Sequence, residues 1–162
     1  MDAMGDSTSQ SWLYRHIVEE TSIAIIFGDR EGVIRFWNKG AEAVFGWAGA
    51  EALGKSVDII IPEKHRARHW EGYAHVMRSG VTKYGSKPLA VPALTKDGRR
   101  ISIEFFISLP RDASSQVLGA VAAIIDVTAQ CSRDKTLREK LASMEAELRN
   151  ARRLGPHSPI EE

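Results

Sequence analysis

The feature that most constrains the fold is an Asp97-Gly98 pair between two β-rich segments. Residues 100–108 alternate apolar and polar side chains, as a strand with one buried face does. Asp-Gly is a typical hairpin turn because glycine readily takes a positive φ. Residues 87–95 are predicted to form the preceding strand, and Pro88 and Pro92 make it irregular or place it at an edge, since proline donates no hydrogen bond to a ladder.

Similar reasoning predicts the elements on either side of this hairpin. A second hairpin is expected around Asp29–Gly32, between two short β-rich runs. Residues 39–53 favour two short helices separated by glycines, and residues 57–61 are predicted to be extended. The most apolar run, residues 117–127, is predicted to be a central strand.

A helix is predicted between Pro62 and Gly80, and it carries His69 on its apolar face. With about 3.6 residues per turn, His75 falls on the opposite, charged face. The residues predicted to share the inward face with His69 are Gly72, Tyr73, Val76 and Met77. An inward imidazole beside a glycine suits a ligand-holding helix. The alternative interpretation is a core histidine that is hydrogen-bonded to the backbone.

Composition limits the classes of protein to which the chain can belong. It has 162 residues, 43% of them hydrophobic, and a net charge of +1, which indicates one globular domain with an appendage. The balanced charge argues against nucleic acid or a membrane as the main partner. The single cysteine and the polar N-terminus predict a cytoplasmic protein. The sequence shows no catalytic motif, so we expect no enzymatic activity.

The predicted domain boundaries follow changes in composition. A disordered tail is expected at 1–10, a flanking helix at 11–20, the compact domain at 21–128, an amphipathic or coiled-coil helix at 129–154 and a second tail at 155–162. Apolar residues follow one face of each flanking helix, which predicts a homodimer. These residues are Trp12, Leu13 and Ile17 in the first helix and Leu137, Leu141, Met144 and Leu148 in the second.

A series of short motifs, in this order and spacing, resembles the PAS domain family over residues 12–130. The motifs are Gly32-Val33-Ile34, Trp37-Asn38, Ala41-Glu42, Phe45-Gly46, Glu51–Lys55, Ile61-Pro62, Asp97-Gly98 and Asp126–Thr128. The resemblance implies an α+β fold with a five-stranded antiparallel sheet, short helices on one face and flanking helices at both ends. It also implies an internal pocket for a sensory ligand and a downstream signalling partner.

Within the family, the Pro62–Gly80 segment is similar to the haem-binding PAS domains of oxygen-sensing kinases and phosphodiesterases. Their Arg-x-x-His motif is matched by Arg66–His69, which implies haem b with His69 as the axial metal ligand. Two positions depart from that pattern: Leu89 stands where the oxygen sensors carry arginine, and Lys87 where the phosphodiesterases carry a distal methionine. The sequence has no cysteine before Cys131, so the photoadduct chemistry of flavin photoreceptors is not expected.

The resemblance also implies which residues line the pocket and where the signal leaves it. Phe105 and Ile107 are predicted to share one face of their strand, with Phe106 opposite. The predicted lining residues are His69, Tyr73, Val76, Met77, Leu89, Val91, Phe105, Ile107 and Ala123. The signal is expected to pass through Asp126 and Thr128 into the last helix. Three functions stay open: a small-ligand sensor, a haem gas sensor, and a cofactor-free interaction and dimerisation module.

Overall fold

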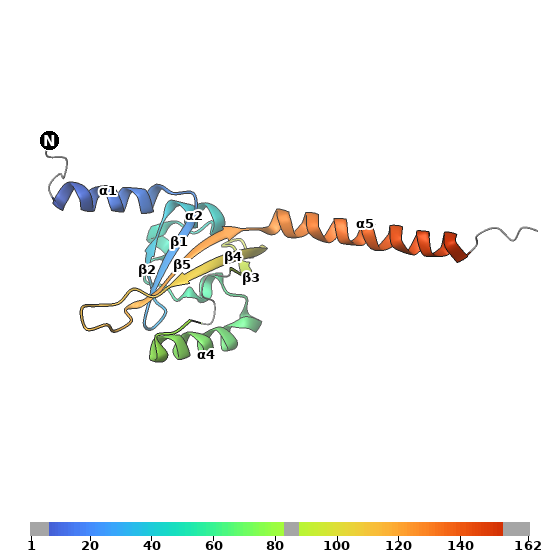
Figure 1. Cartoon of the computed structure of the whole chain (residues 1–162). Helices are drawn as coiled ribbons and strands as arrows, with labels where there is room; N and C mark the ends of the chain where they lie inside the picture. The colour runs from blue at the N-terminus through green and yellow to red at the C-terminus, as the bar shows by residue number, and fades with distance from the viewer. Residues whose placement is uncertain (1–6, 83–87, 154–162) are drawn as a thin grey trace, which may run out of the picture. The chain divides into compact units, whose positions relative to one another are not determined.

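The computed structural model describes residues 7–82 and 88–153 and divides the chain into two units, with the boundary between Val127 and Thr128. The first unit contains a five-stranded antiparallel sheet in the order β2-β1-β5-β4-β3 (Figure 1). Its strands are β1 (Ala24–Asp29), β2 (Ile34–Trp37), β3 (Leu89–Leu94), β4 (Arg100–Ser108) and β5 (Gly119–Asp126). The prediction of an α+β fold with this sheet is confirmed, as are the central place of β5 and the edge position of β3.

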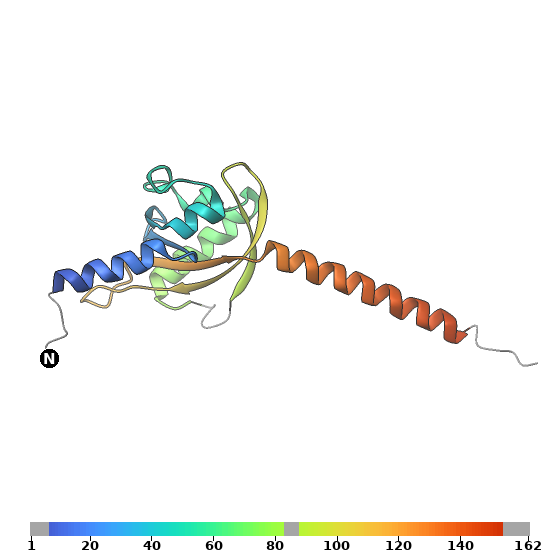
Figure 2. The ribbon, with the colours of Figure 1, turned by 90° about the horizontal axis from the view of Figure 1, so that it is seen from above.

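The helices of the first unit include several short ones, seen from above in Figure 2. They are α1 (Ser7–Glu20), α2 (Lys39–Phe45), α3 (Gly49–Ala52), the 3-10 helix η1 (Val57–Ile60) and α4 (Glu63–Ser79). The division of residues 39–53 into two helices is confirmed, and Gly46 ends α2 with a φ of +75°. The predicted start of the first helix was wrong, because α1 begins at Ser7 and not at residue 11.

The segment predicted to be extended at residues 57–61 is instead the 3-10 helix η1. Its β-branched residues favour a strand, but the Ser56 side chain accepts a hydrogen bond from the backbone N–H of Asp58 and so caps a helical turn. This turn buries Val57 and Ile60 in the core. Local capping therefore prevails over the residue propensity.

The hydrophobic core lies between the sheet and the helices α2, α3 and η1. Alternate residues of the strands supply one side, among them Ile26, Ile101 and Ile124. Phe45 of α2 is fully buried on the other side, beside Trp37. The glycines at the two predicted hairpin turns, Gly32 and Gly98, have φ of +75° and +79°, so both turn predictions are confirmed.

A single buried side chain, that of Asn38, joins β1, α1 and α2. Its Oδ1 atom accepts hydrogen bonds from the backbone N–H groups of Ile25, at 2.8 Å, and Ala41, at 2.9 Å, which caps α2. Its amide nitrogen donates to the carbonyl groups of Val18 and Ile23, both at 2.9 Å. The end of α1 is thus tied to the core by polar contacts, while Trp12, Leu13 and Ile17 stay exposed.

The second unit consists of α5 (Thr128–Arg153), which agrees closely with the predicted C-terminal helix. None of the residues of α5, all of them described, is buried. The four apolar residues of the predicted stripe are between 53% and 66% exposed; they are Leu137, Leu141, Met144 and Leu148. Within the described parts of the chain, no helix has the length and apolar character needed to cross a lipid bilayer.

Candidate functional site

Helix α4 carries the residues that the sequence singled out, and its limits are those predicted. Pro62 precedes its first residue, and Gly80 ends it with a φ of +65°. Over the seventeen residues of α4, every one described, only Met77 is buried. His69, Tyr73 and Val76 are half-buried and His75 is exposed, as the predicted helical faces require. Gly72 is exposed, so its predicted place on the inward face was wrong.

The rings of His69, Trp70 and Tyr73 form a cluster on α4. The imidazole lies 5.2 Å from the ring of Trp70 and 5.6 Å from that of Tyr73, between ring centroids. Trp70 and Tyr73 are themselves 5.6 Å apart in an edge-to-face arrangement. Helix α4 therefore carries an aromatic cluster that includes the imidazole of His69.

The imidazole of His69 has a buried ring nitrogen that makes no hydrogen bond to the described residues. Its Nδ1 atom is buried and has no hydrogen-bond partner among the described residues, and buried polar atoms in native proteins rarely lack one. Burial lowers the pKa of His69 below its ordinary value, and the nearby charge of Asp58 acts in the opposite direction. The ring is therefore held neutral, which is the form that binds a metal.

One turn earlier on α4, His65 repeats this feature. Its Nε2 atom is also buried without a hydrogen-bond partner among the described residues. His65 was not included in the predicted site, although its spacing of four residues from His69 places the two on one face. The described residues contain no group of three or more side chains that could together hold a metal ion.

Trp70 is fixed in place by contacts with two other elements. Its Nε1 atom donates a hydrogen bond of 3.0 Å to the carboxylate of Asp58 in η1. On the other side, its ring lies so close to Gly32 in the β1–β2 turn that any Cβ at that position would overlap it. Sequence reasoning missed the role of Asp58, whose twelve-residue separation from Trp70 follows no local pattern.

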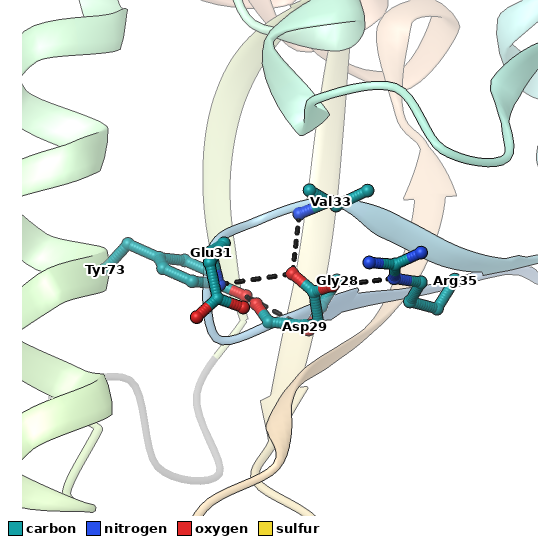
Figure 3. Close-up of polar contacts among 6 residues, drawn as sticks. All are labelled: Gly28, Asp29, Glu31, Val33, Arg35 and Tyr73. Carbon is teal, nitrogen blue, oxygen red and sulfur yellow. Dashed lines mark hydrogen bonds and ion pairs between the residues drawn. The ribbon is translucent and has the colours of Figure 1, made fainter.

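Tyr73 joins α4 to the β1–β2 turn rather than pointing freely into a pocket (Figure 3). Its hydroxyl lies 3.0 Å from the carbonyl oxygen of Gly28 and 2.5 Å from that of Asp29, so it donates to this pair of carbonyls. Burial, together with the negative charge of Asp29, raises the pKa of Tyr73 to about 12. Tyr73 is thus a neutral donor that attaches the helix to the turn.

The turn that receives Tyr73 is built around the carboxylate of Asp29. It accepts hydrogen bonds from the backbone N–H groups of Glu31, at 3.1 Å, and Val33, at 2.9 Å, and from Arg35 at 2.6 Å (Figure 3). Burial disfavours the charged carboxylate, but the bonds from Arg35 and the backbone prevail and lower the pKa of Asp29. The turn is thereby a rigid support for α4.

The sheet contributes fewer of the predicted lining residues than expected. Phe105 and Val91 are half-buried and pack against the core, and Ile107 is half-buried. Phe106, at 42% exposure, lies on the opposite face, as predicted. Leu89 lies in β3, but its side chain is outside the described residues, and Lys87 is outside them altogether.

The prediction for Ala123 was wrong because it depends on the register between β4 and β5. Ala123 is the cross-strand partner of Phe106, and directly paired residues share a face of the sheet. Ala122, which pairs with Ile107 and packs against the core, occupies the inner face instead. The inner face beside Phe105 therefore belongs to Ala122 and Ile124.

A surface hollow of about 480 Å³ lies elsewhere, between the end of α2 and the β3–β4 turn. It is open to solvent, and none of the predicted site residues lines it; the lining residues are Ala43, Val44, Phe45, Gly46, Thr95, Lys96, Asp97 and Arg99. Lys96 is also engaged in an ion pair with Glu51 at 2.6 Å. Phe45 is the one aromatic residue among those that line the hollow.

Whether α4 fits a haem depends on the donor and on its surroundings. A haem iron needs a neutral imidazole nitrogen, of the kind that His69 carries, and a mainly apolar slot. Met77 is buried, Val76 and Phe105 are half-buried, and none of the three lines the hollow described above. The side chain of Arg66 donates hydrogen bonds to the carbonyl oxygens of Ile61 and Asp58. The donor chemistry of His69 is that of a haem axial ligand.

Comparison with known proteins gives a consistent family assignment. The family model described as "PAS fold" matches residues 13–127. The sensor protein FixL of Bradyrhizobium diazoefficiens is 40% identical over 55 residues, which is 34% of this chain and 11% of FixL. The oxygen sensor protein DosP of Escherichia coli is 23% identical over 112 residues, 62% of this chain and 14% of DosP. The chain spans only 11% to 15% of the length of the curated relatives it matches.

Solved structures share the fold at low sequence identity. The PAS domain of a protein from Colwellia psychrerythraea has a TM-score of 0.64 at 21% identity, and covers 75% of this chain and 98% of its own. An RNA-binding light-oxygen-voltage receptor has a TM-score of 0.67 at 20% identity over 92% of this chain and 41% of its own. At these identities the likeness concerns the fold alone.

Proposed function

Because the chain belongs to the PAS family, we propose that it is a sensory module that binds a small ligand or cofactor between α4 and the inner face of the sheet. The observation that carries the proposal is the buried, unpartnered Nδ1 atom of His69 within an aromatic cluster. A binding group is expected to satisfy such an atom, since a buried polar atom left unpaired costs about 1–3 kcal/mol. The proposed role is not enzymatic.

The sharper form of this proposal is a haem gas sensor with His69 as the axial ligand. It is favoured by the neutral imidazole, by the apolar neighbours Val76, Met77 and Phe105, and by similarity to a protein named as an oxygen sensor. Haem would supply an iron atom that binds a diatomic gas. His69 would hold the group, while Trp70 and Tyr73 would fix the orientation of the imidazole through their contacts with Asp58 and the β1–β2 turn.

The visible absorption spectrum of the purified chain, expressed with a haem precursor, tests the proposal. We expect a Soret band that disappears in His69→Ala and persists in His75→Ala, because only His69 lies on the inward face. A native band in the His69 variant would contradict the assignment of the ligand. If the parent shows no band and a thermal-shift screen of small molecules also finds no ligand, the cofactor-free interaction module is the better description.

We also propose that the module works as a homodimer and signals to a downstream protein through its C-terminal helix. The support for a dimer is the exposed apolar stripe of α5, since such stripes are usually covered. Light scattering at micromolar concentration is expected to give the mass of a dimer, and Leu141→Glu to reduce it. A monomeric parent, or an unchanged Leu141→Glu protein, would contradict this role of α5.

The proposed exit of the signal is the end of β5, at Asp126 and Thr128. The support is the connectivity, because β5 is the central strand, ends at Asp126 and is followed at Thr128 by α5. The backbone N–H of Val127, between them, donates a 2.9 Å hydrogen bond to Ser102 in β4. A change in β5 can therefore alter the hydrogen bonds at the start of the helix.

A further inference from the structure

At the C-terminal end of α4, side chains from other elements bond the backbone carbonyl groups. The last carbonyl groups of a helix have no partner within the helix and carry a partial negative charge. At the end of α4 the carbonyl of Val76 accepts the N–H of Gly80 at 2.8 Å. The carbonyls of Met77 and Gly80 are bonded instead by two arginine side chains from other parts of the chain.

The first of these arginines is Arg30, at the tip of the β1–β2 turn. Its guanidinium group donates a hydrogen bond of 2.6 Å to the carbonyl of Val117 and a longer one, of 3.4 Å, to that of Met77. Val117 is buried two residues before β5 begins. Arg30 therefore bridges the end of α4 and the segment that leads into the central strand.

The second is Arg111, in the loop between β4 and β5. It donates at 2.7 Å to the carbonyl of Gly80 and at 2.8 Å to that of Ser115. It lies so close to Gly80 that a Cβ there would approach the guanidinium to 2.6 Å. Ser115 has a φ of +65°, an unusual conformation for a residue other than glycine, and its carbonyl is held by this bond.

The two arginines thus have the same arrangement. Each donates one bond to the end of α4 and another to the segment just before β5, and the forked guanidinium group is suited to bonding two acceptors at once. Both side chains are on exposed residues, so they contribute little to the core. The other polar contacts of α4 described above lead to η1 and, through Tyr73, to the end of β1 and the backbone of Ala120 in β5. Arg30 and Arg111 differ from them in reaching the segment just before β5.

We propose that Arg30 and Arg111 form a two-arginine bridge that couples the C-terminal end of α4 to the start of β5. A displacement of α4 then reaches the central strand, and through it the residues before α5, by way of the carbonyls of Met77 and Gly80. The inference rests on the proposed function for the event that displaces α4. The coupling itself is a property of the ligand-free chain and is tested without that event.

The test uses two substitutions that change the stability of α4 alone. Gly72 and His75 are both exposed, and no atom lies within 4 Å of the position of a Cβ at Gly72. Gly72→Ala should stabilise the helix by roughly fivefold in the opening equilibrium, and His75→Gly should destabilise it by roughly twofold. Native-state hydrogen exchange of the whole chain is then measured at the amides of α4 and at residues 118–121.

In the parent background we expect the amides at 118–121 to exchange more slowly in Gly72→Ala and faster in His75→Gly, following α4. In an Arg30→Ala/Arg111→Ala background, exchange in α4 should still respond to the two substitutions, while the response of residues 118–121 should be clearly reduced. A part of it remains, because Tyr73 still bonds the end of β1, which pairs with Gly119 and Ala120. A matched control, Arg99→Ala/Arg100→Ala, removes two exposed arginines of the β3–β4 hairpin and should leave the coupling intact.

The proposal is overturned if hydrogen exchange at residues 118–121 does not change with the stability of α4 in the parent. It is also overturned if this exchange changes equally when the two arginines are absent. Should the double alanine variant lose its global fold, Arg30→Lys/Arg111→Lys retains the charges but not the forked donors, and the same loss of coupling is expected. Haem binding does not enter these measurements. A chain without a Soret band can therefore still confirm the bridge, and a haem-binding chain can still refute it.

Discussion

Helices α2 and α4 belong to the same unit but are held by different kinds of interaction. The short α2 buries Gly40, Ala41 and Phe45 and is capped by a fully bonded Asn38, so apolar packing fixes it. The longer α4 buries only Met77 among its described residues and is attached by side chains that bond backbone carbonyls. Such contacts contribute about 0.5–1.5 kcal/mol each and can be exchanged. The difference suggests that α2 maintains the fold, whereas α4 can move within it.

The largest effect is expected from Phe45→Ala in α2. Phe45 is fully buried beside Trp37, so the variant leaves a cavity and should lose about 3–5 kcal/mol of unfolding free energy in urea titrations. Phe106→Ala removes the same ring from a position with 42% exposure and should cost about 1 kcal/mol or less. Equal losses of unfolding free energy in the two variants would mean that packing of Phe45 in the core does not hold α2 in place.

A smaller effect is expected from Tyr73→Phe, which removes one attachment of α4 and leaves the ring in place. The free energy of unfolding should fall by about 1 kcal/mol, and amide hydrogen exchange should become faster in α4 but not in α2. Tyr14→Phe, at an exposed position of α1, is the matched control and should change neither.

The same pair of variants has a signature at high pH. The pKa of Tyr73 is about 12 in the folded chain and about 10 when unfolded, because folding disfavours the phenolate. The contribution of this pKa difference to the free energy of unfolding is therefore complete below about pH 10, and it is lost as the pH rises through about 12. The parent and Tyr14→Phe should lose stability more steeply than Tyr73→Phe over this range.

The smallest effect concerns the protonation of His69. Burial lowers its pKa in the folded chain, so the folded state disfavours the imidazolium, and stability should fall as the pH drops below the unfolded value of about 6.5. Urea titrations at pH 7.5 and 5.5, values chosen on either side of about 6.5, should show a smaller decline in His69→Gln than in the parent. His75→Gln should retain the decline of the parent, since His75 is exposed.

Much of the fold could be predicted because its signals are local. Gly32 and Gly98 mark the two hairpins, and the alternation in residues 100–108 gave the bounds of β4 and the opposite faces of Phe105 and Phe106. The faces of α4 followed from the periodicity around His69. Each of these features depends on residues within a few positions of one another.

The errors arise where the answer depends on distant parts of the chain. Ala123 was placed on the wrong face because the register between β4 and β5 cannot be deduced from either strand alone. The hydrogen bond from Arg30 to Val117 joins residues 87 positions apart, and no pattern in the sequence predicts it. Gly72 shows the limit of an ideal helical wheel, since a small angular error moves a residue at the edge of a face into solvent.

The contact between Gly32 and Trp70 also restricts the order in which this sequence can change during evolution. Gly32 is restricted twice, by its φ of +75° and by the indole ring that occupies the place of a Cβ. A smaller residue at position 70 removes the steric restriction and leaves only the cost of the backbone conformation, which asparagine or aspartate tolerates best. If position 32 changes first, the new Cβ overlaps the ring of Trp70. The two positions are therefore epistatic, and the accessible path is the one in which Trp70 is replaced before Gly32.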